Sequence, residues 1–187
     1  LPKGAFAALK DWRLWLRASR IMGGITSIRT ALSTEPIANV FGAFFIGPIV
    51  AYTLSALFLK EQAGWARTGL LILGFIGVLM VVQPGPGMRV GLLFAVMAGC
   101  FYGSFLTVSK WLVDAAPPLT LLFTQLAIPA LLTAPFGLAQ IPSIDLWTGA
   151  MVAGSSLSSM GGNLLLLVAF SLAQSPRLAP FVYFQIV

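Results

Sequence analysis

The chain has 187 residues, of which 58% are hydrophobic and only 9% are charged. Soluble domains carry about 25% charged residues, and a core of this size cannot hide so many apolar side chains. The composition therefore excludes an ordinary soluble domain, a disordered tail and a nucleic-acid-binding protein, and it predicts a multi-pass membrane protein. The formal net charge of +6 is expected to mark cytoplasmic loops, where Lys and Arg gather.

The residues that usually carry chemistry are scarce. The chain has no histidine and a single cysteine, Cys100, which argues against a disulfide framework, a His-ligated metal or haem, and His acid–base catalysis. The five carboxylates fall at predicted helix ends or in loops, and none pairs with another at helical spacing. The glycines of residues 84–87 belong to a turn, because no Lys-Ser or Lys-Thr pair follows them as in a phosphate-binding loop. We therefore expect a protein that is not an enzyme and binds no cofactor.

Apolar segments long enough to cross a bilayer as helices, about 20 residues each, follow one another along the chain. Helix is the expected structure, because lipid cannot satisfy the backbone polar groups of an open sheet. The connections are short and rich in Gly and Pro, as at helix ends. The last segment stops within the bilayer and the chain opens on Leu, so we expect part of a longer protein. The predicted spans are Ile37–Leu59, about Trp65–Val82, Val90–Leu112, Leu119–Gln140, about Leu146–Ala173, and a sixth from near Leu178.

The segment Ala18–Thr34 is harder to assign, since it is short and contains Arg20 and Arg29. If it spans the membrane, most of the 11 basic residues share one side, as the positive-inside rule favours. If it does not, they divide more evenly between the two sides. Before it, apolar positions recur on one helical face, so residues 1–17 are predicted to form a cytoplasmic helix in the membrane interface. A solvated loop is the alternative for that segment.

Polar residues inside the spans are the candidates for ligand contacts, because they are costly in lipid and tend to face the bundle interior. Each can instead form an interhelical hydrogen bond, worth about 0.6 kcal/mol. Arg29 either extends to the outer interface, where Glu35 is a candidate partner, or holds an anionic group of a substrate bidentately in a central cavity. The candidate substrate-binding residues are Arg29, Tyr52, Tyr102, Gln125 and Asn163.

Prolines and small residues form the second group of noteworthy positions. Pro48, Pro129 and Pro135 remove backbone hydrogen bonds, which makes them candidate helix bends or gating points, although prolines are common in membrane helices without such a role. Gly99 and Gly103 form a small-xxx-small pair that predicts close helix packing. A longer stripe of small residues also predicts packing, with the lining of a polar cavity as the alternative. It consists of Ser155, Ser158, Ser159 and Gly162.

A span end, a polar turn, a proline and a new span occur twice, over residues 31–38 and 171–179. The repeating unit holds five helices, and an odd number reverses the orientation of the second copy in the membrane. With this repeat, the sequence resembles the EamA-type drug/metabolite transporters from Arg17 onward. The resembling positions are Ala31-Leu32 with Pro36, Pro48, 57–61, Gly69 with Gly74 and Gly77, Gln83-Pro84, and 179–185.

The resemblance implies an all-α, polytopic transmembrane helix bundle of two inverted five-helix repeats, both truncated here. Residues 18–83 are then the C-terminal part of the first repeat, and residues 90–187 are the N-terminal part of the second. Two positions depart from the family pattern. Lys60 replaces a usual small residue, and Arg29 replaces an apolar or aromatic one. The departure at Arg29 leaves the typical substrates of the family in question.

The resemblance also implies a function, namely transport of a small metabolite or drug across the cytoplasmic (inner) membrane of a bacterium by alternating access. Without a nucleotide-binding motif, the energy is expected to come from an ion or solute gradient or from exchange. The expected partners are the lipid bilayer and a small-molecule substrate, and a homodimer is left open. A membrane-embedded enzyme acting on lipid and a non-transporting scaffold subunit are the alternatives. The enzyme needs a nucleophile or acid–base pair near the interface, and only scattered Ser and Thr are present.

Overall fold

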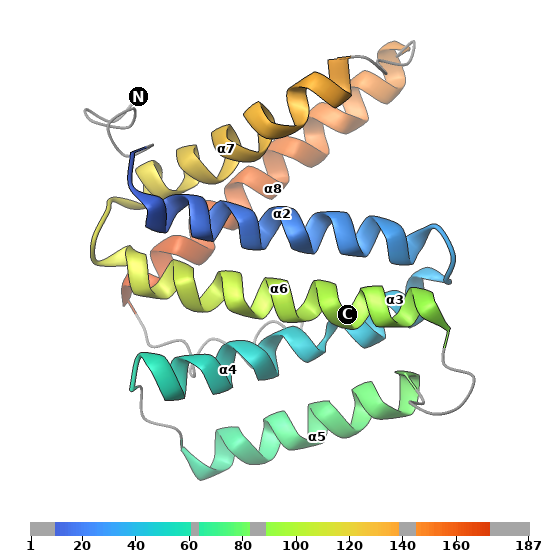
Figure 1. Ribbon diagram of the computed structural model, residues 1–187, viewed down its shortest axis with the longest axis vertical. Helices are drawn as coiled ribbons and strands as arrows, with labels where there is room; N and C mark the ends of the chain where they lie inside the picture. The colour runs from blue at the N-terminus through green and yellow to red at the C-terminus, as the bar shows by residue number, and fades with distance from the viewer. Residues whose placement is uncertain (1–9, 61–63, 83–88, 139–144, 173–187) are drawn as a thin grey trace.

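The computed structural model describes residues 10–60, 64–82, 89–138 and 145–172, and within these ranges the regular elements are all α-helices. Figure 1 shows the helices lying side by side and running alternately in opposite directions, with α6 in the middle of the bundle. The predicted all-α fold is confirmed. The helices are α2 (Trp12–Leu32), α3 (Ile37–Phe44), α4 (Ile46–Phe58), α5 (Trp65–Val82), α6 (Val90–Val113), α7 (Pro118–Leu138) and α8 (Leu146–Leu172).

Four helical segments in the described ranges are long and apolar enough to cross a membrane. α5 has the predicted bounds, but its apolar part, Thr68–Met80, is shorter than these four. α2 has 21 residues, which is sufficient length to span, although its arginines lower its hydropathy. The predicted sixth span from near Leu178 lies outside the described residues. The four apolar segments are Ile37–Phe58, Val90–Val113, Pro118–Pro135 and Leu146–Leu172.

The N-terminal boundary differs from the one drawn from sequence. Asp11 begins α2 by accepting a hydrogen bond from the backbone N–H of Arg13, at 2.9 Å from its Oδ1. From there α2 continues without a break to Leu32, so no boundary separates residue 17 from Ala18. The described end of the segment 1–17 is therefore the beginning of α2. Its cytoplasmic, interfacial location stays a prediction.

The predicted span Ile37–Leu59 is divided into α3 and α4 close to Pro48, Gly99 and Gly103. Pro48 lacks the N–H that would bond the Phe44 carbonyl, and its ring crowds that carbonyl. This carbonyl faces α6, where a Cβ on Gly99 would lie only 2.5 Å from it. A Cβ on Gly103 would likewise collide with the Gly47 carbonyl. The predicted bend and the predicted packing pair are therefore one feature, at which the backbones of α4 and α6 touch.

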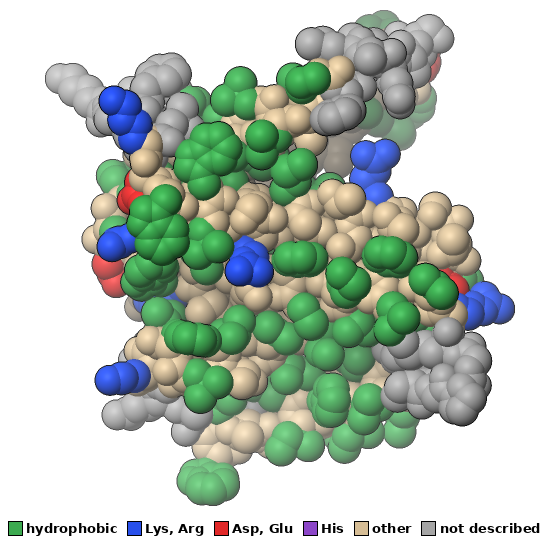
Figure 2. Space-filling model, in the orientation of Figure 1, with side chains coloured by type: hydrophobic (Ala, Val, Ile, Leu, Met, Phe, Trp, Pro, Cys, Tyr) green, Lys and Arg blue, Asp and Glu red, His purple; other side chains and the backbone are tan. Residues whose placement is uncertain are grey.

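Two clusters of buried apolar side chains hold the described helices together. The larger joins α2, α4, α6, α7 and α8 around Phe105, Leu121 and Leu167, and the smaller joins α2, α3, α5 and α6 around Val40 and Ala95. Figure 2 shows further hydrophobic side chains exposed over the helices, as expected of a surface that faces lipid.

α8 is the least covered of the long helices, and only Leu167 and Phe170 are buried in it. Ser155, Ser158 and Ser159 are exposed, and nothing described lies within 4 Å of a Cβ built on Gly162. The packing predicted for this small-residue stripe is therefore not present among the described residues.

The alternating helix directions bring four of the described basic residues to one end of the bundle, which we call the basic end. It carries Lys10, Arg13, Lys60 and Lys110, and Lys and Arg side chains gather toward the left of Figure 2. Trp111 also lies there, with the Arg13 guanidinium 5.0 Å from the centre of its ring. These four residues belong to the group that the positive-inside rule predicted to share one side. That the basic end faces the cytoplasm stays a prediction.

Candidate functional site

Arg17 of α2 is buried inside the bundle with only 1% of the residue exposed. Its guanidinium donates three hydrogen bonds, from Nε to Ser109 Oγ at 2.8 Å, from Nη1 to the Leu121 carbonyl at 2.8 Å, and from Nη2 to Gln125 Oε1 at 2.6 Å. The guanidinium also lies 4.8 Å from the centre of the Phe105 ring. Each of these acceptors is neutral, so hydrogen bonds and ring contact, rather than a carboxylate, compensate for the burial of the charge.

The hydrogen bonds continue from Arg17 to a fourth helix. Gln125 Nε2 donates to Asn163 Oδ1 at 2.9 Å, and Asn163 Nδ2 donates to the Ser159 carbonyl at 2.9 Å. We call this set, which runs from Ser109 through Arg17 and Gln125 to Asn163, the Arg17 network. It joins α2, α6, α7 and α8, and it brings together two of the five candidate binding residues. Arg17 itself was not among those candidates.

The two candidate tyrosines lie elsewhere in the bundle. The Tyr52 hydroxyl is hydrogen-bonded to Thr68 Oγ1 at 2.6 Å, which links α4 to α5. Tyr102 lies between two rings, with its centroid 5.2 Å from that of Phe44 and 6.1 Å from that of Phe105. Because Arg17 covers the same Phe105 ring, Tyr102 adjoins the Arg17 network through aromatic packing. Tyr52 is not part of it.

Arg29 is exposed in the last turn of α2, where a cation is favoured by the helix dipole. It lies about 18 Å along the helix axis from Arg17, at 1.5 Å per residue. Glu35, the candidate partner of Arg29, is buried and instead forms an ion pair with Arg89, at 3.4 Å from Oε2 to Nη1. The suggested Arg29–Glu35 pair is therefore wrong. The described residues do not bring Arg29 to the other four candidates.

The three candidate prolines have different surroundings. Pro48 is buried at the division between α3 and α4. Pro129 and Pro135 lie inside α7, which continues through both of them. Pro129 has no N–H to bond the Gln125 carbonyl, so its helix loses a backbone hydrogen bond at a residue of the Arg17 network. A gating role for these prolines stays a prediction.

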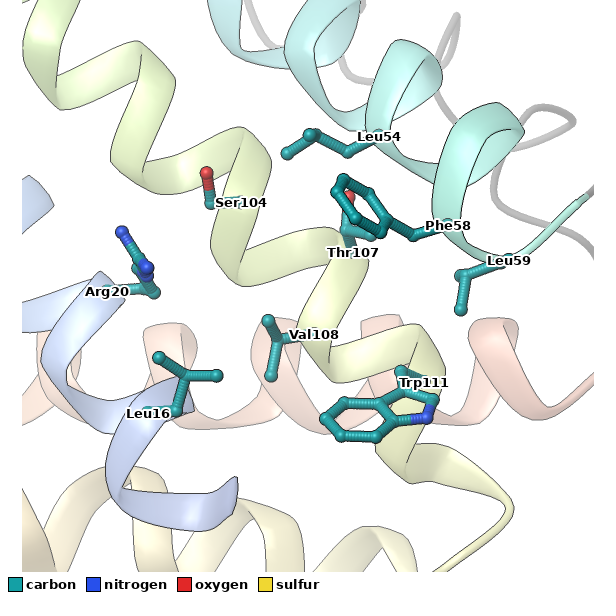
Figure 3. Close-up of a pocket in the computed structure, with 9 residues that line it drawn as sticks. All are labelled: Leu16, Arg20, Leu54, Phe58, Leu59, Ser104, Thr107, Val108 and Trp111. Carbon is teal, nitrogen blue, oxygen red and sulfur yellow. The ribbon is translucent and has the colours of Figure 1, made fainter. Parts of the chain in front are cut away.

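A pocket of about 540 Å³ opens between α2, α4 and α6 (Figure 3). Its walls are mostly apolar and aromatic, and Arg20 is the charged residue among the side chains that line it. The other polar residues are Ser104, which donates to the Cys100 carbonyl at 2.8 Å, and Thr107, which donates to the Gly103 carbonyl at 3.1 Å. The lining residues are Leu16, Arg20, Leu54, Phe58, Leu59, Ser104, Thr107, Val108 and Trp111.

This pocket lies toward the basic end, because its lining comes from the first half of α2 and the second halves of α4 and α6. Arg20 is half-buried and forms no hydrogen bond or ion pair with a residue of the described chain. The sequence did not indicate this pocket, since it forms only where three separate helices come together in the fold. The local signal was an arginine within a largely apolar helix.

Comparisons with known proteins find relatives along most of the chain. Over 92% of its length it is 26% identical to proteins named S-adenosylmethionine uptake transporter from Rickettsia bellii (strain RML369-C) and Rickettsia conorii (strain ATCC VR-613 / Malish 7), covering 60% and 59% of them. Over 89% of its length it is 23% identical to a riboflavin transporter of Brucella anthropi, covering 61% of it. The chain thus spans about three fifths of the length of the curated relatives it matches.

No family model and no solved structure matches the chain. The relatives that do match are named as transporters rather than enzymes, in agreement with the prediction that the chain is not an enzyme. Together with the four apolar helices, these relatives support a multi-pass membrane protein that resembles small-metabolite transporters.

Proposed function

We propose that the chain forms part of a multi-pass transporter that moves a small metabolite across the cytoplasmic membrane of a bacterium. The observation that carries this proposal is the similarity, over 92% of the chain, to proteins named for the uptake of S-adenosylmethionine. The bundle adds physical support, because a buried arginine, two carboxamides and a pocket of about 540 Å³ lie between its helices. Charged and polar groups are costly at membrane depth and typically mark solute pathways.

The proposed architecture is that of an EamA-type drug/metabolite transporter with two inverted five-helix repeats. Residues 18–83 then belong to the first repeat and residues 90–187 to the second. In transporters of inverted repeats, the solute site lies between the repeats and is exposed to each side in turn by alternating access. An ion or solute gradient, or exchange against a second solute, supplies the energy in this proposal.

The candidate binding residues take different roles in the proposal. Gln125 and Asn163 connect α7 to α8 within the Arg17 network, so a change in their hydrogen bond moves two helices of the second repeat. Tyr102 lines the interior beside Phe105, and Tyr52 holds α5 against α4. Arg29 remains a candidate for an anionic group of a solute that enters from the end of the bundle opposite the basic end.

The test is solute flux in liposomes that contain the complete gene product. Radiolabelled S-adenosylmethionine, riboflavin and a panel of small metabolites are offered with and without a gradient of protons or Na⁺, and empty liposomes are the control. We expect saturable flux of at least one solute, which competes with the unlabelled compound. Folded protein that moves none of these solutes under any gradient, or that converts lipid instead, would contradict the proposed function.

A further inference from the structure

We propose that Arg20 makes the pocket between α2, α4 and α6 a binding site for solutes that carry one anionic group, a carboxylate or a phosphate, on a flat apolar body. This inference rests on the proposed function, because it names the class of solute that the transporter takes.

Arg20 lines a pocket and has no partner in the described chain, whereas three other arginines are satisfied by neighbouring groups. Arg17 has three hydrogen-bond acceptors, Arg13 lies over Trp111, and Arg89 pairs with Glu35. Arg20 is half-buried, lines the pocket, and contacts no carboxylate in the described chain. A partly desolvated guanidinium gains strongly from a carboxylate or phosphate, which its planar fork binds with two parallel hydrogen bonds.

The remaining walls fit an apolar, planar body. Figure 3 shows the Phe58 and Trp111 rings on the side of the pocket away from Arg20, with Leu54 and Leu59 next to them. A volume of about 540 Å³ is within the usual range of small-molecule sites, which bind ligands through apolar walls and a few polar groups. Aromatic rings favour offset or edge-on contact with a flat ligand.

The spacing along α6 sets the length of the solute. Ser104 lies beside Arg20, and Trp111 lies two turns further along the same helix, about 10 Å away at 1.5 Å per residue. A solute with its anionic group at Arg20 and its ring at Trp111 therefore needs a short linker between the two. Small aromatic acids and the phosphate esters of planar ring compounds have this shape.

The charges at the basic end favour the entry of such a solute. Arg13 and Lys60 are exposed near the end of the bundle toward which the pocket lies, and the exposed carboxylate Asp114 is nearby in the connection after α6. Positive charges at the mouth of an apolar cleft raise the local concentration of anions. Salt screens this attraction over about 8–10 Å, so capture is expected to weaken as ionic strength rises.

The experiment compares two probes of nearly equal shape, 4-phenylbutyrate and its neutral amide, by titration calorimetry on the complete gene product in neutral-lipid nanodiscs. The variants are Arg20→Gln, Arg20→Lys and, as a matched control at the opposite end, Arg89→Gln. We expect the unmodified protein to bind the carboxylate about tenfold or more tightly than the amide. Arg20→Gln should abolish this preference, Arg20→Lys should retain part of it, and Arg89→Gln should retain all of it.

A second set of nanodiscs with anionic phosphatidylglycerol separates a free solute from a lipid headgroup. If the anionic lipid displaces 4-phenylbutyrate and Arg20→Gln releases that lipid, the pocket is a lipid site and the inference is wrong. Equal affinity for acid and amide, or an unchanged preference in a folded Arg20→Gln, also overturns it. Flux of a neutral solute through Arg20→Gln would then show that the proposed transport function still stands.

Discussion

Two arginines three residues apart on α2 have opposite surroundings. Arg17 is 1% exposed and donates to three acceptors, whereas Arg20 is half-buried at a pocket and donates to none in the described chain. Both side chains carry the same charge on the same helix. The difference lies in the neighbouring helices, which supply polar acceptors to one arginine and apolar walls to the other.

Helical geometry explains why two arginines only three residues apart have such different surroundings. Residues three apart lie on neighbouring parts of one helical face, about 60° apart around the axis. Arg17 points to α6 and α7, where Ser109 and Gln125 accept its hydrogen bonds. Arg20 points to the pocket between α2, α4 and α6. The hydrogen bonds of Arg17 connect α2 to α6 and α7, whereas a guanidinium without an acceptor at a pocket is available to a ligand.

Replacement of Arg17 should have the largest effect on stability. Arg17→Ala leaves Ser109 and Gln125 without their partner in the interior, at about 1–3 kcal/mol for each unsatisfied group, and it removes the contact with Phe105. We expect a fall of several degrees in the thermal midpoint of the detergent-purified protein. Arg17→Lys keeps the charge but cannot reach all three acceptors, so its midpoint should lie in between. An unchanged midpoint in Arg17→Ala would show that the network does not hold the bundle together.

Thiol labelling tests whether the two arginines differ in access to water. In a Cys100→Ser background, Ser104→Cys at the pocket should react about tenfold or more faster than Ser109→Cys beside Arg17 with a small water-soluble thiol reagent, because reaction needs an accessible thiolate. Ser104 is half-buried at the pocket, and Ser109 is 0% exposed. The Cys100→Ser protein alone gives the background rate. Similar rates at the two positions would remove the distinction between a sealed and an open site.

The positions of the helices could be predicted from the sequence, because hydropathy and helix-breaking residues are local signals. The predicted span Val90–Leu112 became Val90–Val113, and about Trp65–Val82 kept its bounds. Gly99 and Gly103 also kept their predicted role, since close packing needs small residues whichever helix is the partner.

The Arg17 network could not be predicted in the same way, because the residues that bond to each other in it are far apart in the chain. Arg17 lies 92 residues from Ser109, 104 from Leu121 and 108 from Gln125 along the sequence. Its basic neighbours in the sequence are Arg13 and Arg20, so a pattern of surface basic residues at a membrane interface explained Arg17 equally well. Gln125 and Asn163 were identified one at a time, and only the fold shows that they bond each other.

The smallest expected effect is the coupling between Gln125 and Asn163, which ends the Arg17 network on α8. A double-mutant cycle compares Gln125→Leu, Asn163→Leu and the double variant. Gln125→Leu removes an acceptor of Arg17 whether or not Asn163 is present, so that loss cancels in the cycle. The remaining coupling energy is that of the hydrogen bond between Gln125 and Asn163. Hydrogen bonds between membrane helices average about 0.6 kcal/mol, so we expect a coupling of about that size in the free energy of unfolding. Gln125→Leu alone should destabilise more than Asn163→Leu, because Gln125 is buried and is also an acceptor for the buried Arg17, whereas the second hydrogen bond of Asn163 stays within α8. A coupling near zero, with changed solute affinity in both single variants, would assign the pair to the solute rather than to helix packing.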